Sequence, residues 1–410
     1  MKVLFDSYHN LSDLGSGAAI SARSLLRELV QRGAEAATVS GAFFDGDVPS
    51  CAVFLQSLRR QGIRSDVKKG TIKRNEGQKL DSFQVVHYND DGVDSTAFLP
   101  EEAFASPQSA YDISLASSKA FHRLLYDKIA EFSPDVFLSY GGYRTAFNGP
   151  RIARRFGATT VFYLCNHSYR RKELFNEYDA CVVPSEHTRK HYRDLIGLDA
   201  LVLPPIIDEA RTLTDSNTRE FVTLINLSRE KGLFFFLGIA RELEKRRPEI
   251  PLLVVESRTS ALELLKIPGA SALSNLHVMK TTTRPSEIYA RTRITLVPSL
   301  CEETFGRVAV ESALNGIPVL TSGRGALSEI LPSEFCLPIP KRFTPFANAS
   351  PTPDEVAPWV DAIIRLWDDV ALALRVGEKL KEATQIYRQE RVAQLSFETF
   401  AQFIKARRAL

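Results

Sequence analysis

The chain has 410 residues, of which 44% are hydrophobic and 25% are charged, and its formal net charge is +3. This composition is typical of a globular protein, and the length is sufficient for two or three domains. The near balance of 52 basic and 49 acidic residues argues against a dedicated nucleic-acid binder, which would carry a large basic surplus.

The cysteines and the apolar runs indicate the compartment. The five cysteines are scattered and include no CxxC pair, which argues against a disulfide framework and against a zinc site. The sequence contains no run of about 18 apolar residues, and its N-terminal segment becomes polar after one short strand, unlike a secretory signal. We therefore expect a cytoplasmic protein.

In the first half of the chain, short apolar runs alternate with longer amphipathic stretches, a pattern typical of parallel sheets with crossover helices. Helical spacing predicts a helix over Ala18–Arg32 that ends at Gly33. The predicted strands of this half are Lys2–Asp6, Ala37–Ser40, Gln84–Tyr88, Val136–Tyr140, Thr160–Leu164, Ala180–Pro184 and Leu201–Leu203.

The second half repeats this rhythm after a hinge candidate, the proline-containing and polar segment 204–215. Its predicted elements are strand Phe221–Leu227, helix 232–246, strands Leu252–Val255 and Leu276–Met279, helix 286–291, strand Ile294–Pro298, helix 306–315, strand Pro318–Thr321, and two closing helices, 355–370 and 372–405. Together the two halves predict an α/β protein with two Rossmann-like, doubly wound domains that face each other across a cleft. Ligands are expected at the carboxyl ends of the strands.

The most informative segment is 297–322, in which a predicted strand ends at Pro298 and a helix begins near Phe305 or Gly306. A glycine lets a ligand approach the backbone closely, and the first N–H groups of a helix favour an anion. Glu303 before this turn and Glu311 within the helix can accept hydrogen bonds from hydroxyl groups. A ligand that carries both hydroxyl and phosphate groups suits this combination.

This segment resembles the GT-B glycosyltransferases, in particular the large retaining family 4. The E-x7-E motif of that family fits Glu303 to Glu311, and Asn315-Gly-Ile-Pro-Val follows in the expected register. The resemblance is specific over residues 297–330 and looser over the rest of the chain. It implies that Glu303 binds hydroxyls of the donor sugar and that Glu311 binds the ribose of the nucleotide. Three further residues of the motif are expected at the donor: Thr304, Phe305 and Gly306.

The segment Asn226-Leu-Ser-Arg-Glu-Lys-Gly232 lies where a predicted strand meets its helix, the usual position of a phosphate. Lys231 can place an ammonium on the donor diphosphate. Family members usually have an arginine at the position of Asn226. Arg229 or Arg307 could supply the missing charge; alternatively, the diphosphate is held with one cation fewer.

The first β–α connection carries Gly15, Ser16 and Gly17, and resembles the glycine-rich loop that family members place against the donor phosphate and the acceptor. It also half-matches the dinucleotide fingerprint GxGxxG. Ile20 replaces the third glycine, and the predicted strand ends at Asp6, too early for that tight turn. A nicotinamide site is therefore disfavoured.

His167 lies at the carboxyl end of a predicted strand, and its position resembles that of the N-domain histidine of the family, which contacts the donor sugar beside the anomeric centre. With Glu303 and Lys231 it completes the predicted catalytic set. His9 follows the first strand and could also face the cleft. Three other histidines fall on predicted helices and are expected at the surface: His122, His187 and His191.

No metal site is expected. Asp45-Gly-Asp47 matches the DxD motif of the other main glycosyltransferase fold, but the two-domain rhythm argues against that fold, so we interpret these residues as an acidic loop. Basic residues surround His187 and His191, which are spaced four apart, and would repel a cation.

A basic segment, residues 58–79, carries eight lysines and arginines against two acidic residues. Three interpretations stay open for it: contact with an anionic membrane, worth about 1 kcal/mol per charge near the surface, a solvated mobile loop, or a dock for an acidic acceptor.

The resemblance implies a retaining glycosyltransferase that moves a sugar from a nucleotide-diphosphate sugar, such as a UDP- or GDP-sugar, to a hydroxyl acceptor without a cofactor or essential metal. Residues 1–205 would form the acceptor side and residues 216–384 the donor side, with the C-terminal helix of residues 385–410 packed back on the first domain. The acceptor stays open between a lipid, a glycan, a metabolite and a peptide. The alternatives are an epimerase on the same scaffold, a GT-B protein that binds the nucleotide sugar without transfer, and a nicotinamide oxidoreductase.

Overall fold

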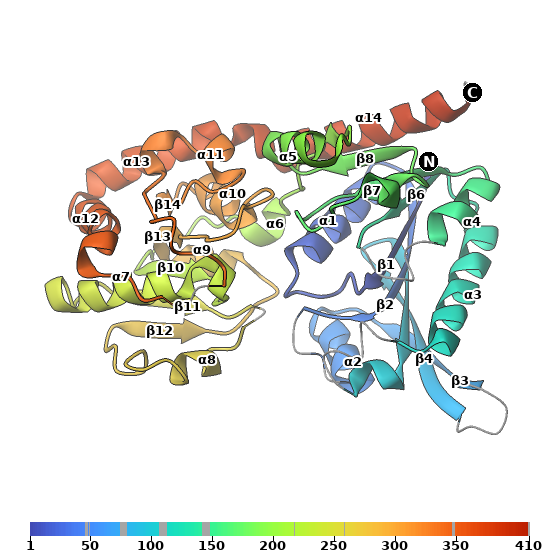
Figure 1. Ribbon diagram of the computed structural model, residues 1–410, viewed down its shortest axis with the longest axis horizontal. Coiled ribbons are helices and arrows are strands. Elements are labelled where there is room, and N and C mark those ends of the chain that lie inside the picture. The colour runs from blue at the N-terminus through green and yellow to red at the C-terminus, as the bar shows by residue number, and fades with distance from the viewer. Residues whose placement is uncertain are drawn as a thin grey trace. The chain divides into compact units, whose positions relative to one another are not determined.

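The computed structural model describes residues 1–45, 48, 50–73, 80–105, 113–141, 148–216, 218–257, 259–346 and 349–408 (Figure 1). The chain divides into two compact units. The first unit comprises Met1–Pro184, Arg189–Pro205 and Val392–Leu410, and the second comprises Ser185–Thr188 and Ile206–Arg391.

The first unit is built on a nine-stranded sheet of order β3-β4-β5-β2-β1-β6-β7-β8-β9, in which β4 runs antiparallel to both of its neighbours and the other pairs are parallel. The strands are β1 (Lys2–His9), β2 (Glu35–Phe43), β3 (Ser65–Lys73), β4 (Leu80–Asp90), β5 (Val93–Pro100), β6 (Val136–Ser139), β7 (Thr159–Tyr163), β8 (Ala180–Val183) and β9 (Leu201–Val202). Its central strands are almost fully buried, as expected for a parallel sheet covered on both faces.

Helices pack against this sheet and complete the core of the first unit. They are α1 (Gly17–Gln31), α2 (Cys51–Arg60), α3 (Leu115–Phe132), α4 (Gly149–Arg155), α5 (Glu186–Ile196, from Arg189 on) and α14 (Gln389–Arg408, from Val392 on). One core cluster joins Leu4 and Tyr8 of β1 to Phe121 of α3. The last helix is held by Arg407, whose Nη1 lies 2.9 Å from Asp179 Oδ2.

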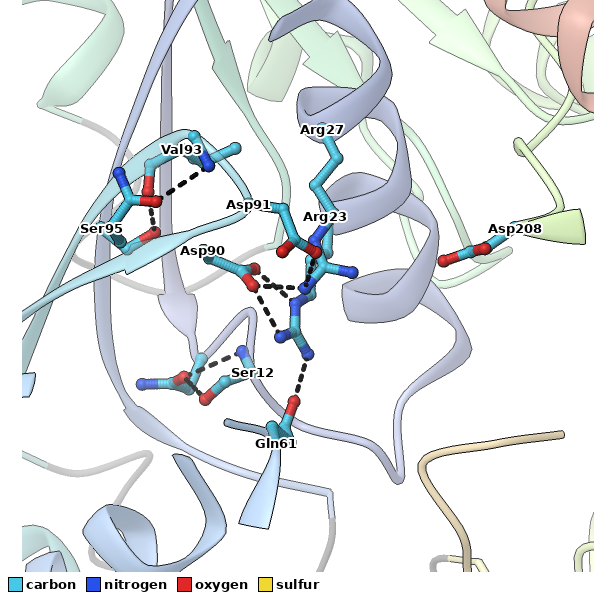
Figure 2. A network of polar contacts seen from close by, with 12 residues as sticks. Ser12, Arg23, Arg27, Gln61, Asp90, Asp91, Val93, Ser95 and Asp208 are labelled. Atoms are coloured by element: carbon cyan, nitrogen blue, oxygen red, sulfur yellow. Dashed lines mark hydrogen bonds and ion pairs between the residues drawn. The ribbon is translucent and has the colours of Figure 1, made fainter. Parts of the chain in front are cut away.

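A buried ion-pair network attaches α1 to the β4–β5 hairpin, and Figure 2 shows Arg23 and Arg27 converging on Asp90 and Asp91. Arg23 Nη2 donates to Asp90 Oδ1 at 2.8 Å, and Arg27 Nη2 lies 3.0 Å from Asp91 Oδ2. Burial alone would raise the pKa of Asp90, but the two guanidinium groups hold it below its ordinary value. The hairpin turns through Asp91 and Gly92, which both have positive φ, as a two-residue type I′ turn requires.

The second unit contains a five-stranded parallel sheet of order β12-β11-β10-β13-β14. The strands are β10 (Phe221–Ile225), β11 (Leu252–Val255), β12 (Leu276–Met279), β13 (Thr292–Val297) and β14 (Val319–Thr321). The helices are α6 (Glu209–Thr212), α7 (Leu233–Arg246), α8 (Leu262–Leu265), α9 (Ser286–Arg291), α10 (Arg307–Leu314), α11 (Leu327–Ile330), α12 (Pro353–Asp368) and α13 (Val370–Ala383). Trp359 of α12 packs on Phe235 of α7 at the centre of the main core.

The predicted α/β class with parallel sheets is confirmed, while several boundaries were wrong. β1 continues to His9 rather than ending at Asp6, because its polar residues Ser7 and His9 are buried in the sheet. The expected helix 372–405 is two helices, α13 and α14, separated by a short turn at Gln385–Tyr387. Among the described residues, no helix is both long and apolar enough to cross a membrane.

Of the three interpretations of residues 58–79, the solvated mobile loop was wrong for the described part of that segment. Its residues end α2 and form β3, whose nine residues pair with β4 in an antiparallel ladder. The sequence of strand β3 is polar because the strand lies at the edge of the sheet, where lysines are common. Residues 74–79 lie outside the described residues.

Candidate functional site

Two loops of the second unit meet at the carboxyl ends of its central strands. One follows β13 and leads into α10, and the other follows β10 and leads into α7. Leu300 N donates to Glu230 O at 2.8 Å, which joins the two loops through their backbones. The strands β10 and β13 are neighbours in the sheet, so the loops that follow them emerge side by side.

The two loops bring Lys231 and Glu303 together. Lys231 Nζ lies 2.6 Å from Glu303 Oε1, and Ser299 Oγ donates to the same oxygen at 2.5 Å. The side chains of Lys231 and Glu303 are 26% and 12% exposed. Burial alone would lower the pKa of Lys231, but the negative charge of Glu303 raises it above its ordinary value. A protonated ammonium and a carboxylate therefore share one partly open position.

Glycines make the approach of these loops possible. Gly232 has φ +88°, and a Cβ there would lie 2.1 Å from Pro298 O. Gly325 has φ +66°, and a Cβ there would lie 2.4 Å from Glu303 N. Ala326 N donates to Glu303 O at 2.8 Å, so the backbone of Glu303 rests directly on the turn after β14. Any larger residue at either glycine would push the loops apart.

The backbone conformation of Asn226 suits an asparagine better than the arginine that the family resemblance implies at this position. Asn226 has φ +75°, a left-handed conformation that asparagine adopts more readily than arginine. Its Oδ1 accepts a hydrogen bond from Ser228 N at 3.1 Å, and Ser228 O accepts one from Lys231 N at 3.1 Å. Asn226 thus shapes the turn that presents Lys231.

The two arginines considered as replacements have other contacts. Arg307 Nη2 lies 3.0 Å from Glu311 Oε1, and Arg307 Nη1 donates to Ile206 O at 3.3 Å. The guanidinium of Arg229 lies 5.5 Å from the ring centroid of Phe234. The charge of Arg307 is therefore largely used to balance Glu311.

Glu311 lies in α10 and is 7% exposed. Its Oε2 accepts a hydrogen bond from Tyr289 Oη at 2.7 Å, and its Oε1 faces Arg307. Burial, followed by the charge of Glu311, raises the pKa of Tyr289 well above its ordinary value. Each carboxylate oxygen has two lone pairs, so Glu311 retains capacity to accept from a ligand hydroxyl. The sequence pattern gave no indication of Tyr289.

The remaining predicted donor residues, Thr304, Phe305 and Gly306, lie between Glu303 and Glu311 in the sequence. Gly306, with φ +94°, is the N-cap of α10, and Phe305 packs on Tyr387 with ring centroids 5.2 Å apart. Thr304 O accepts a hydrogen bond from Thr188 Oγ1 at 3.2 Å. His187, expected at the surface, is instead half-buried, and its Nε2 lies 3.6 Å from Glu302 Oε2.

In the first unit, the loop that precedes α1 is braced by Asp13. Asp13 Oδ1 accepts from Gly15 N at 2.8 Å, and Asp13 Oδ2 accepts from Asp45 N at 2.5 Å. His9 Nε2 lies 2.9 Å from Asp13 Oδ2. Burial alone would raise the pKa of Asp13, but the hydrogen bond and charge of His9 hold it below its ordinary value. Ser16 is the N-cap of α1, which starts at Gly17.

His9, Asp13 and Asp45 also offer ligand atoms within 4.8 Å of one another, so their chemistry could hold a metal ion. This proximity is not visible in the sequence, because Asp45 is far from His9 along the chain and its pattern predicts an acidic loop. The side chain of Asp45 is in fact largely buried, whereas Asp47 lies outside the described residues.

His167 follows β7 and is half-buried. Its ring stacks on that of His191 in α5, with centroids 4.2 Å apart and planes inclined by 33°. His191 was expected at the surface, and that expectation was wrong, because it is half-buried against His167. Helical spacing in the sequence could not reveal a partner from another element.

Comparisons with known proteins bear on this arrangement. Residues 207–377 match the family described as glycosyl transferases group 1. A search of curated proteins by sequence found no match. The whole chain is similar in fold to a structure of HepE from Anabaena in complex with UDP-glucose, with a TM-score of 0.63, 15% identity, and coverage of 98% of this chain and 100% of that chain.

Two further solved structures share the fold. Starch synthase IV from Arabidopsis thaliana, bound to ADP and acarbose, has a TM-score of 0.63 at 11% identity and covers 98% of this chain and 99% of its own. The pneumococcal O-GlcNAc transferase GtfA, in complex with UDP and GlcNAc, has a TM-score of 0.61 at 11% identity with the same coverage. The matched family and the fold support a glycosyltransferase. The chain thus has the GT-B fold, and its residues 207–377 match the family model of the glycosyl transferases group 1.

Proposed function

We propose that this protein is a retaining glycosyltransferase that moves a sugar from a nucleotide-diphosphate sugar to a hydroxyl acceptor. The observation that carries the proposal is the contact of 2.6 Å between Lys231 and Glu303 inside the matched domain. This position offers a cation for a diphosphate and a carboxylate for sugar hydroxyls within hydrogen-bond distance of each other. Few other ligand classes need both groups so close together.

In this proposal Lys231 binds the donor diphosphate and stabilises the charge that develops on it as the glycosidic bond breaks. Glu303 accepts hydrogen bonds from hydroxyls of the transferred sugar. Ser299 holds Glu303 in place from the other side, with its Oγ 2.5 Å from the carboxylate. The carboxylate of Glu311 accepts hydrogen bonds from the ribose hydroxyls with the lone pairs that Tyr289 and Arg307 do not occupy.

The transfer step balances without a protein nucleophile. The bond between the anomeric carbon and the diphosphate oxygen breaks, a bond to the acceptor oxygen forms on the same face, and the acceptor proton passes to the departing phosphate. His167 contacts the sugar beside the anomeric centre. The donor side is assigned to residues 216–384 and the acceptor side to residues 1–205, and neither a metal nor a cofactor takes part.

The donor class follows from chemistry and from similarity. HepE, starch synthase IV and GtfA were solved with UDP-glucose, with ADP, and with UDP and GlcNAc. We extend a nucleotide-diphosphate sugar to this chain on that basis, with a UDP-, GDP- or ADP-sugar as the candidates. All five cysteines are free thiols, which supports a reducing compartment such as the cytoplasm.

Two measurements test the proposal. Thermal unfolding is measured with a panel of nucleoside diphosphates and nucleotide sugars. It should identify the nucleobase of the donor, since a ligand at 100 times its Kd stabilises the fold by about 2.7 kcal/mol. The best donor is then incubated with hydroxyl acceptors, and the anomeric configuration of the product is read by NMR. Inversion would refute retention. Epimerised donor that accumulates without acceptor would indicate an epimerase, and tight binding without any turnover would indicate a binding protein.

A further inference from the structure

We infer that Arg324 is a positioning residue that holds the loop of Glu303 in register with the loop of Lys231. This inference rests on the proposed function, because it assigns a support to the two side chains that the proposal places at the donor. Arg324 lies in the turn that follows β14, in the same compact unit as both loops. Strand β14 is the neighbour of β13 in the sheet, so this turn emerges beside the loop that carries Glu303.

The guanidinium group of Arg324 contacts the backbone of two other segments. Its Nη1 donates to Leu300 O at 2.6 Å and to Phe343 O at 3.0 Å. An Nη atom carries two hydrogens, so one nitrogen can serve both carbonyl oxygens. Leu300 precedes Glu303 in the loop after β13, and Phe343 precedes α12. Arg324 therefore joins these two segments.

Phe343 supplies a rigid end for this connection. It is 1% exposed, and its ring packs against that of Phe235 in α7 with centroids 5.4 Å apart. Both residues belong to the main core of the second unit. The backbone of a residue packed in this way moves little, because protein cores are as dense as organic crystals. Arg324 thus fixes the position of Leu300 relative to the core.

The peptide group between Leu300 and Cys301 is held from both edges. Its carbonyl oxygen, Leu300 O, accepts from Arg324, and its N–H group, Cys301 N, donates to Glu230 O at 3.3 Å. A peptide group is planar, so a hydrogen bond at its oxygen also fixes the direction of its N–H group. Arg324 therefore orients an N–H group through which the Glu303 loop contacts the Lys231 loop.

The chain of hydrogen bonds continues into the Lys231 loop. Glu230 O belongs to the peptide group between Glu230 and Lys231, and Lys231 N donates from that group to Ser228 O at 3.1 Å. Hydrogen bonds that follow one another through peptide groups polarise and strengthen each other. The first donor here is a charged guanidinium, which forms stronger hydrogen bonds than a neutral N–H group. Removal of the Arg324 side chain should therefore loosen the backbone of both loops.

The side chains of Lys231 and Glu303 depend on this register. Lys231 Nζ lies 2.6 Å from Glu303 Oε1, and each side chain extends from one of the two loops. In the proposed function, Lys231 stabilises charge that develops as the donor bond breaks. A displaced ammonium should therefore slow the chemical step more than it weakens donor binding. Arg324 acts on this step through the two side chains.

Enzyme kinetics on three variants test this role: Arg324→Ala, which removes the donor, Arg324→Lys, which keeps a donating cation, and Arg219→Ala as the matched control. Arg219 is half-buried as well and donates to the carbonyl oxygens of Asn315 and Gly316. These carbonyls precede β14 and so belong to the opposite edge of the sheet from the two loops.

We expect Arg324→Ala to lower kcat by about tenfold, with the donor KM changed less than about threefold. Arg324→Lys should recover most of the lost rate, because an ammonium can still donate to Leu300 O. Arg219→Ala should keep kcat within about twofold of the unmodified enzyme. Equal kcat values in Arg324→Ala and Arg219→Ala overturn the inference.

A double-mutant cycle shows whether Arg324 acts through Lys231. In Lys231→Ala, the additional change Arg324→Ala should lower transfer by less than about twofold, because the group that it positions is gone. A further loss of about tenfold would show that Arg324 acts independently of Lys231 and would also overturn the inference.

Hydrogen exchange separates failure of this inference from failure of the proposed function, because it does not depend on activity. In Arg324→Ala the amide hydrogens of Cys301 and Lys231 should exchange at least about tenfold faster than in the unmodified protein and in Arg219→Ala. Arg324→Lys should show a smaller change in the same direction, so the test holds if Arg324→Ala does not fold. Unchanged exchange at Lys231 overturns the inference. Faster exchange at both amides in a protein that transfers no sugar supports the positioning by Arg324 and refutes the proposed function alone.

Discussion

Two charged clusters in this molecule lie at the carboxyl ends of parallel strands, but they differ in what surrounds their carboxylates. In the second unit, the Glu303 carboxylate accepts from the side chains of Lys231 and Ser299 and stays partly open. In the first unit, Asp13 is 2% exposed in its side chain and receives two backbone N–H groups as well as His9. Side-chain partners can exchange for a ligand, whereas backbone partners cannot leave without unfolding the loop. The comparison indicates that the cluster around Asp13 stabilises a loop, whereas the cluster around Glu303 is the one suited to bind a ligand.

The largest loss of stability is expected at Gly232, where the loop that carries Lys231 lies directly against the backbone of Pro298. Gly232→Ala places a Cβ against Pro298 O in a left-handed conformation, and should lower the free energy of unfolding by about 3 kcal/mol. Gly269→Ala is the matched control, because Gly269 has φ +74° but an added Cβ there would meet no atom within 4 Å. It should cost only about 1 kcal/mol. The free energy of unfolding of both variants is measured with a denaturant. Equal losses in Gly232→Ala and Gly269→Ala would show that the close approach of the loops adds nothing to the cost of the substitution.

Asp13→Ala tests the brace and should destabilise the first unit by about 2 kcal/mol, because it leaves two buried N–H groups and His9 without their acceptor. The pKa of Asp13 is lowered in the folded state, so its carboxylate stabilises the fold above the unfolded pKa of about 3.9. This stabilisation is lost as the pH falls through the lower, folded pKa.

The difference in the free energy of unfolding between the unmodified protein and Asp13→Ala should therefore narrow as the pH falls below about 4. Thermal unfolding across this range measures it. A gap that widens toward acid would contradict the direction of the shift. Addition of Mn²⁺ or Zn²⁺ sharpens the comparison further, since a brace should gain little stability from either ion, whereas a metal site would gain several degrees.

Replacement of either member of the binding pair should lower sugar transfer at least tenfold, equivalent to about 1.4 kcal/mol. Glu303→Ala removes the acceptor for sugar hydroxyls and leaves Lys231 without its partner, and Lys231→Ala removes the cation for the diphosphate. Glu302→Ala is the control, because this neighbouring carboxylate is exposed and contacts only the side chain of His187 among the ion pairs described. Full activity in both Glu303→Ala and Lys231→Ala would end the assignment of this site.

Much of the fold could be predicted because the parallel sheets have a simple signature. Strand Leu252–Val255 is fully apolar, strand Leu276–Met279 has one histidine among apolar residues, and both were predicted to the residue. Strand β3 was missed because its lysines and its antiparallel partner break the expected rhythm. A short-range pattern describes a buried parallel strand well, and an edge strand poorly.

The residues of the candidate site likewise include some that the sequence predicts and some that it does not. Lys231 and Glu303 could be placed near each other from sequence, because each follows a strand whose carboxyl end carries ligands in this class of fold. Tyr289 and His191 could not be found, since each reaches its partner only through tertiary packing. Asn226 looked like a lost cation in the sequence, and only its positive φ shows the structural reason for the residue.

The smallest effect should distinguish a structural partner of Glu311 from a ligand-binding role. Tyr289→Phe removes the donor to Glu311 Oε2 and should cost about 1 kcal/mol of stability without ligand. If Glu311 binds ribose, the ribose hydroxyls replace the lost donor, so saturating nucleoside diphosphate should stabilise Tyr289→Phe more than the unmodified protein. Tyr126→Phe, at an exposed tyrosine, should behave as the unmodified protein does in both conditions. An equal ligand-induced shift in Tyr289→Phe and in the unmodified protein would place Glu311 outside the ribose site and leave the nucleotide to Lys231 and the start of α10.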